Sequence, residues 1–189
     1  MLNPAEINIG ALTELRHHLH SIAELSGNEE QTAAKITEFL ESTNPDKITT
    51  GLGGHGLLAK YKGKEKGPTI LIRCELDALP IPEENDFNYL SKNENTGHKC
   101  GHDGHMAIVC GLAKILGKNR PKSGVVMLLF QPAEETGQGA QRVLNDKKFS
   151  NINPDWVFAL HNLPGYEKDQ ILLRKDTFAA ASIGLIIRL

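Results

Sequence analysis

The N-terminal part of the sequence has the residue spacing of two amphipathic helices. Over residues 5–26, apolar side chains recur mostly at steps of three and four residues, and Gly27 follows as a stop signal. A second helix is predicted after Asn28, a suitable N-cap, with acidic residues in its first turn and Asn44-Pro45 at its end. Two helices should therefore precede any sheet.

Beyond this point the sequence changes to short β-rich runs that later alternate with helical stretches. Strands are predicted at residues 47–50, 56–61, 69–74, 125–130 and 156–160, and helices at residues 104–116 and 137–144. Strands separated by helices usually form a largely parallel sheet with helices on both faces. We therefore predict an α/β fold whose ligands bind at the carboxyl ends of the strands.

Composition and charge narrow the possible functions. The chain has 189 residues, 40% of them hydrophobic, which is enough for a buried core. There are 21 Lys and Arg against 23 Asp and Glu, without long runs of one sign, which argues against nucleic acid or an anionic membrane as a partner. The N-terminus lacks a signal pattern, no apolar run is of membrane-spanning length, and the three cysteines have no disulfide-like spacing. We expect a cytoplasmic protein.

The densest group of reactive side chains is the segment from His98 to His105, with three histidines, a thiol and a carboxylate separated by glycines. Cys100 and His102 are two residues apart, so they cannot share a helix face, but a loop entering a helix can direct both at one ion. The helix dipole should also favour the thiolate of Cys100. The non-functional alternative is that these are loop histidines beside a buried cysteine. It explains poorly why so many reactive side chains lie within eight residues.

Other candidates follow the predicted strands. Glu134 and Glu135 come directly after the strand at 125–130, so one carboxylate can bind metal while its neighbour transfers a proton, although an acidic pair at a helix start is the simple alternative. His161 follows the strand at 156–160, and alone it would be read as a surface histidine. Asp77 follows the strand at 69–74, where it can orient a ligating histidine or merely begin a turn.

Four motifs together carry a resemblance to a known family. Along the chain these are D-A-L-P, C-G-H-D-G-H, a strand followed by Q-P-A-E-E, and L-H-N, and they resemble, in the same order, the motifs of peptidase family M20, the aminoacylase and carboxypeptidase family. The chain looks most like its amidohydrolase branch, which includes hippurate and aminoacyl-auxin hydrolases. The resemblance implies a zinc-peptidase-like catalytic domain. It also implies Cys100, His102, Glu135 and His161 as metal ligands, with Cys100 bridging two ions, Glu134 as general base and Asp77 as a support of the metal site.

The same resemblance implies how the chain is organised. Members of the family carry a β-rich lid or dimerisation domain inserted into the catalytic domain. We expect residues 1–169 to be the N-terminal part of the catalytic domain. Residues 170–189, with β-rich runs at 171–173 and 182–189, would lead into the lid and form its first strand. On this reading the chain is truncated at the start of the lid, and the full-length protein is a homodimer.

The implied reaction is hydrolysis of the amide bond of an N-acyl amino acid or small peptide by a metal-activated water, with Glu134 as general base. One or two divalent ions are expected, zinc or manganese, with cobalt or nickel also compatible with Cys, His and Glu ligands.

Two positions depart from the family pattern: Glu75 stands where this branch usually has aspartate, and Lys99 replaces a small residue.

Three alternatives remain open. The chain could be an incomplete, non-catalytic metal-binding fragment of such an enzyme. It could be a cysteine hydrolase that uses Cys100 with His102 or His105, although the Glu134–Glu135 pair has no task in that mechanism. A purely structural zinc site is the weakest alternative, because such sites favour four Cys or His ligands without paired acids.

Overall fold

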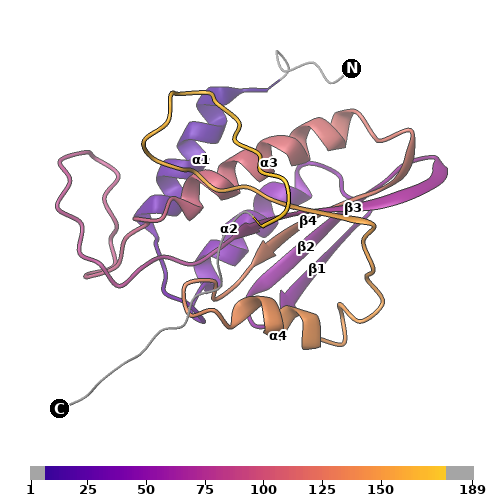
Figure 1. Ribbon diagram of the computed structural model, residues 1–189. Coiled ribbons are helices and arrows are strands. Elements are labelled where there is room, and N and C mark those ends of the chain that lie inside the picture. Colours follow the sequence, from indigo (N-terminus) through magenta and orange to yellow (C-terminus); the bar gives the residue numbers. More distant parts are fainter. Residues whose placement is uncertain (1–6, 178–189) are drawn as a thin grey trace.

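The computed structural model describes residues 7–177, which form an α/β structure on one five-stranded sheet (Figure 1). The helices are α1 (Ile9–Ser21), α2 (Glu30–Glu41), α3 (His102–Lys118) and α4 (Gly139–Asn145). The strands are β1 (Lys47–Leu52), β2 (Gly56–Lys62), β3 (Glu65–Glu75), β4 (Ser123–Gln131) and β5 (Trp156–Ala159). The elements predicted up to residue 160 are therefore confirmed, with shifts at their ends.

The largest shift concerns the end of the first helix. Helix α1 ends at Ser21, five residues before the predicted end, because the chain there turns to meet the segment that follows β3. The backbone oxygen of Glu24 accepts a hydrogen bond from the Ala78 N–H (2.8 Å), and Leu25 forms a β-bridge with Ala78. Tertiary contacts thus override a helical pattern that continues further in the sequence.

The start of α2 also differs from the prediction. The N-cap is Glu29 and not Asn28, and the Glu29 side chain makes no capping hydrogen bond. Instead, the carboxylate of Glu24 accepts hydrogen bonds from the N–H groups of Gln31 (3.1 Å) and Thr32 (2.8 Å). These are two of the N–H groups at the helix start that have no partner within the helix. A side chain from the preceding loop therefore caps α2.

The sheet has the strand order β1-β2-β4-β3-β5. Strand β3 pairs in parallel with β4 and β5, as the alternation of strands and helices predicted. The β1–β2 and β2–β4 pairs are antiparallel, and a short glycine-containing turn joins β1 to β2 as a hairpin. The parallel half of the sheet therefore brings the carboxyl ends of β3, β4 and β5 to one edge.

Helices cover both faces of the sheet, as predicted. Helices α1, α2 and α3 lie on one face and the short α4 lies on the other (Figure 1). The larger core cluster lies under the three helices and includes Leu19, Ile36, Met106, Tyr61 and Phe130. The smaller cluster, on the side of α4, includes Leu52, Leu71, Leu129, Val143 and Phe149. Two apolar layers thus fix the sheet from both sides.

The last part of the described chain is exposed. Strand β5 lies at the edge of the sheet, and its Trp156, Val157 and Phe158 side chains are 62%, 61% and 54% exposed. The predicted β-rich run at 171–173 contains no strand, and the run at 182–189 lies outside the described residues. An apolar edge strand of this kind is a surface at which further chain can pair or pack.

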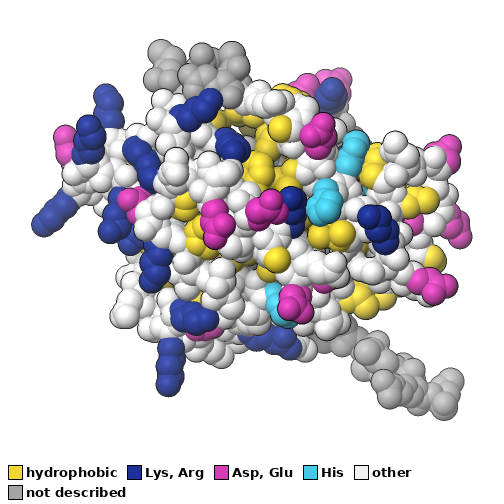
Figure 2. Space-filling model, turned by 180° about the vertical axis from the view of Figure 1, so that it is seen from behind, with side chains coloured by type: hydrophobic (Ala, Val, Ile, Leu, Met, Phe, Trp, Pro, Cys, Tyr) yellow, Lys and Arg dark blue, Asp and Glu magenta, His cyan; other side chains and the backbone are white. Residues whose placement is uncertain are grey.

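The surface carries charges of both signs. On the face turned away from the view of Figure 1, acidic side chains lie among lysines and arginines, and hydrophobic side chains line a hollow (Figure 2). Within residues 7–177, no helix combines the length and the hydrophobicity needed to cross a membrane.

Candidate metal centre

The fold brings the predicted site residues to the edge of the sheet where the three parallel strands end. Because these carboxyl ends and the start of α3 adjoin, side chains far apart in the sequence converge there. The residues come from four segments: Asp77 after β3, Cys100 and His102 at the start of α3, Glu134 and Glu135 after β4, and His161 after β5.

His102 lies at the centre of this group and is fully buried. Its Nδ1 atom donates a hydrogen bond to the backbone oxygen of Asp77 (2.8 Å), which leaves Nε2 free to accept. Nε2 lies 3.7 Å from Glu135 Oε1 and 3.9 Å from Glu134 Oε2. Among the described residues, neither His102 Nε2 nor Glu135 Oε1 has a hydrogen-bond partner. Two buried acceptors that face each other without a shared proton fit a cation between them.

Cys100 and His161 complete the group around His102. Cys100 Sγ lies 3.3 Å from His161 Nε2. Cys100, His102 and His161 offer ligand atoms within 4.8 Å of one another, and so do His102, Glu134 and Glu135. Ligand atoms bound to one ion at bond lengths of about 2.0–2.3 Å lie roughly 3–4 Å apart, so both groups have suitable spacing.

Asp77 contacts both His102 and the segment that carries Glu135. Its Oδ2 atom accepts hydrogen bonds from Ser26 Oγ (2.6 Å) and from the backbone N–H of Glu135 (3.0 Å). Burial alone would raise the pKa of Asp77, but the nearby His102 ring, together with hydrogen bonds from Ser26 and the Glu135 backbone, outweighs it and holds that pKa at about 2. Asp77 therefore remains a carboxylate that holds the segment of Glu135, while the backbone oxygen of the same residue orients the His102 ring.

The protonation of Cys100 differs from the expectation based on the helix dipole. Burial and the neighbouring carboxylate of Glu135 raise the pKa of the Cys100 thiol to about 12. Negative charge on the nearby acids thus outweighs the dipole of α3. A thiol with this pKa is a poor nucleophile, which argues against the cysteine-hydrolase alternative, whereas a bound cation would offset the same negative charge.

Glu134 is placed differently from its neighbour. Its side chain is 37% exposed against 19% for Glu135, so it faces the open side of the group. Burial raises the pKa of Glu134, and the charge of Glu135 adds to this effect, while His102 opposes it. A partly exposed carboxylate with a raised pKa is suited to accepting a proton.

A residue that the sequence did not single out holds the segment of the two acids. Ala133, just before them, has a left-handed backbone (φ 49°), which alanine rarely adopts. Its N–H donates to Oε1 of Glu29 (2.7 Å), and the same oxygen accepts the N–H of Gly27 (2.8 Å). Glu29 is fully buried. The sequence could not reveal this role of Glu29, because an acidic residue near a helix start is common and does not indicate a contact with a distant segment.

The three histidines of the 98–105 segment do not share one location. His102 is central, and His105 lies beside it with its ring centroid 5.5 Å away. His98 is buried near His20, where neither of its ring nitrogens has a hydrogen-bond partner among the described residues. Burial lowers the pKa of His98 to about 4, so it stays neutral.

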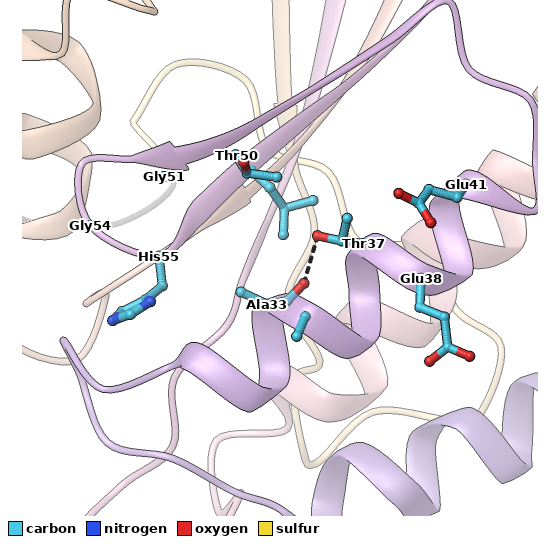
Figure 3. A pocket seen from close by; sticks show the side chains of 10 residues that line it. Ala33, Thr37, Glu38, Glu41, Thr50, Gly51, Gly54 and His55 are labelled. Atoms are coloured by element: carbon cyan, nitrogen blue, oxygen red, sulfur yellow. Dashed lines mark hydrogen bonds between the residues drawn. The ribbon is translucent and has the colours of Figure 1, made fainter.

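A groove of about 410 Å³ lies elsewhere, between α2 and the turn that joins β1 to β2 (Figure 3). His55 lies at one end of it, and Glu38 and Glu41 lie at the other (Figure 3). The only hydrogen bond drawn there joins Thr37 Oγ1 to the Ala33 backbone within α2. The groove has no convergent set of ligand atoms, so it is separate from the metal centre.

Comparison with known proteins gives consistent matches. Residues 71–175 match the profile of Peptidase family M20/M25/M40. The chain is 39% identical over 172 residues to the putative amidohydrolase YhaA of Bacillus subtilis, covering 90% of this chain and 43% of that protein. It is 38% identical over 154 residues to the N-acetylcysteine deacetylase of Bacillus subtilis, covering 81% and 40%.

A solved structure supports the same assignment. The structure of the Bacillus subtilis YXEP protein, described as a dinuclear metal-binding peptidase from the M20 family, superposes with a TM-score of 0.76 at 38% identity. The superposition covers 82% of this chain and 43% of that one. The chain thus spans less than half the length of these relatives. With matching motifs, fold and sequence profile, the chain belongs to peptidase family M20/M25/M40.

Proposed function

We propose that this chain provides the metal-binding part of a hydrolase that cleaves the amide bond of N-acyl amino acids or small peptides. The observation that carries the proposal is the convergence of Cys100, His102, Glu135 and His161, where Nε2 of buried His102 has no hydrogen-bond partner within residues 7–177. A similar protein is named as an N-acetylcysteine deacetylase, which supports a substrate with an acylated amino group.

Each side chain has a task in this proposal. Cys100, His102, Glu135 and His161 would hold one or two divalent ions, zinc or manganese, and Cys100 would serve both ions if two were bound. When bound, these ions activate a water and polarise the amide carbonyl. Glu134 accepts a proton from the attacking water and passes it to the departing amine, because its partly exposed carboxylate faces the group. The backbone oxygen of Asp77 keeps the His102 ring in the orientation that presents Nε2, and the Asp77 carboxylate holds the segment of Glu135.

The test compares the chain with Glu134→Gln, which removes the proton acceptor but keeps the side-chain size. Metal content and hydrolysis of a panel of N-acyl amino acids are measured for both proteins. Glu38→Gln serves as the control, since Glu38 is an exposed acid on α2 outside the site. We expect equal metal content in all three and a loss of hydrolysis of roughly 10²- to 10⁴-fold in Glu134→Gln alone.

Two other outcomes would change the assignment. Metal bound without hydrolysis in any of the three would identify a non-catalytic metal-binding piece of such an enzyme. A chain that binds neither zinc nor manganese would overturn the ligand assignment itself. A cytoplasmic location and a homodimeric full-length protein remain predictions from the sequence.

A further inference from the structure

A line of polar contacts runs behind the metal centre and crosses the ends of three adjacent strands. Gln131 Oε1, at the end of β4, accepts a hydrogen bond from Arg73 Nε of β3 (2.9 Å). Arg73 Nη1 pairs with Glu75 Oε1, and His105 Nδ1 donates to Glu75 Oε2 (2.8 Å). His105 Nε2 then contacts Asn162, which follows β5. The line thus joins the segment that carries the two acids to the segment that carries His161.

The central members of this line are shielded from water. The side chains of Glu75 and His105 are only 1% and 2% exposed. A buried carboxylate is costly unless it is paired, and here Arg73 and His105 each occupy one of its oxygens. Both oxygens of the buried Glu75 carboxylate are therefore paired, which offsets the cost of burying its charge.

Asn162 is held between His105 and the loop that carries Cys100. Its side-chain oxygen lies 2.6 Å from His105 Nε2, and its backbone nitrogen lies 3.1 Å from the same atom. The side chain also packs on Gly101, where an added Cβ would come within 2.6 Å of that oxygen. Gly101 has a left-handed backbone (φ 93°), so the loop both turns there and leaves room for Asn162.

The position of Asn162 determines where the preceding residue points. His161 Nδ1 lies 2.7 Å from the backbone oxygen of Asn162, which fixes the plane of the ring. The other nitrogen, Nε2, then lies 3.3 Å from Cys100 Sγ. His161 comes from an exposed strand end, and its ring also packs edge-on against that of His105, with ring centroids 4.6 Å apart, so its aim depends on these contacts.

His105 could instead be regarded as a metal ligand, because Glu75, His102 and His105 also offer ligand atoms within 4.8 Å of one another. Both ring nitrogens of His105, however, already have partners: Glu75 at Nδ1 and Asn162 at Nε2. His102 differs, since its Nε2 has none among the described residues. The hydrogen bonding therefore favours positioning over ligation for His105.

We propose that Glu75, His105 and Asn162 are positioning residues that hold His161 against Cys100, with His105 as the link between the end of β3 and the loop after β5. This inference rests on the proposed metal-dependent function. Partners that orient a metal ligand in this way typically contribute roughly 10- to 100-fold to metal affinity or activity.

The experiment measures zinc binding and cobalt absorption spectra on the full chain and on His105→Ala, His105→Gln and Asn162→Ala. Cobalt reports coordination directly, since its thiolate band depends on Cys100 and its visible bands on the number of ligands. We expect zinc affinity to fall roughly 10- to 100-fold in His105→Ala and Asn162→Ala, with unchanged stoichiometry and an altered cobalt spectrum. His105→Gln, which retains one polar contact, should recover part of the loss.

His55→Ala is the matched control, because His55 lies by the separate groove and has no contact with the site. Circular dichroism shows whether each variant folds. If His105→Ala does not fold, Asn162→Ala alone tests the positioning role. This variant should fold, because the backbone N–H of residue 162 can still contact His105. Unchanged affinity and spectra in folded variants overturn the positioning role, and loss of a whole ion per chain would make His105 a ligand. A wild-type chain that binds no metal overturns the proposed function together with this inference.

Discussion

Replacing Glu29 with alanine should destabilise the chain and weaken its metal centre at the same time. Glu29 is fully buried, and its Oε1 atom accepts hydrogen bonds from the N–H groups of Gly27 (2.8 Å) and Ala133 (2.7 Å). Alanine leaves the N–H of buried Ala133 without a partner, whereas the N–H of Gly27, an exposed residue, can turn to water. The Ala133 backbone, held at φ 49°, is then free to relax and to move Glu134 and Glu135 with it.

The magnitude follows from those two contacts. A buried N–H group that loses its partner, here that of Ala133, costs about 1–3 kcal/mol, and the exposed N–H of Gly27 costs less because water replaces Glu29. We expect Glu29→Ala to lower the free energy of unfolding by about 2 kcal/mol. Glu29→Gln keeps an acceptor oxygen and should cost less, about 1 kcal/mol, mainly from the lost charge.

Urea unfolding gives the change in stability, and zinc titration of the folded protein gives the effect on the site. Glu24→Ala is the matched control, because Glu24 is also a buried carboxylate that accepts two backbone N–H groups, but those belong to α2. It should destabilise the chain without changing zinc affinity. The reasoning fails if Glu29→Ala unfolds at the same urea concentration as wild type, or if both variants weaken zinc binding equally.

Two further predictions concern the acid stability of Asp77 and the backbone at Gly101. The pKa of Asp77 is about 2 in the fold against an ordinary value of 3.8. A lowered pKa contributes stability in full above the unfolded value, and about 2 kcal/mol of it is lost as pH falls from about 4 to about 2. Urea midpoints measured across this range should fall more steeply for wild type than for Asp77→Asn, and parallel curves would contradict the role of Asp77. Gly101→Ala should cost about 1–2 kcal/mol because of its left-handed backbone, more if Asn162 is displaced, and should weaken zinc binding. Gly104→Ala, where an added Cβ meets nothing within 4 Å, should be neutral or slightly stabilising, and equal urea midpoints for the two alanine variants would contradict the strain at Gly101.

Much of the fold was predictable because hydrophobic periodicity is a local signal. The strands that end at Glu75, Gln131 and Ala159 are apolar runs bounded by polar or glycine-containing segments, so their carboxyl ends could be located from the sequence. Parallel pairing then explains why residues after each strand meet. The antiparallel β1–β2 and β2–β4 pairs were not predicted, since β4 lies between β2 and β3 only through long-range packing.

The residues that support the site were much harder to predict. Glu29 and His105 act through partners 104 and 57 residues away in the sequence, and no spacing rule reports contacts of that range. Cys100 shows a related limit. Its place before a helix suggested a lowered pKa, whereas burial in the fold and two acids from another strand end, Glu135 and Glu134, raise the pKa.

The exposed edge strand β5 provides the chain with a natural optical reporter. Trp156 is its single tryptophan and lies at the first position of that strand, paired with Ile70 and 62% open to solvent. Tryptophan emission shifts to the blue and becomes protected from soluble quenchers when the ring leaves water. The fluorescence of the unmodified chain therefore reports whether this apolar edge is covered, whether by more of the same polypeptide or by a second molecule.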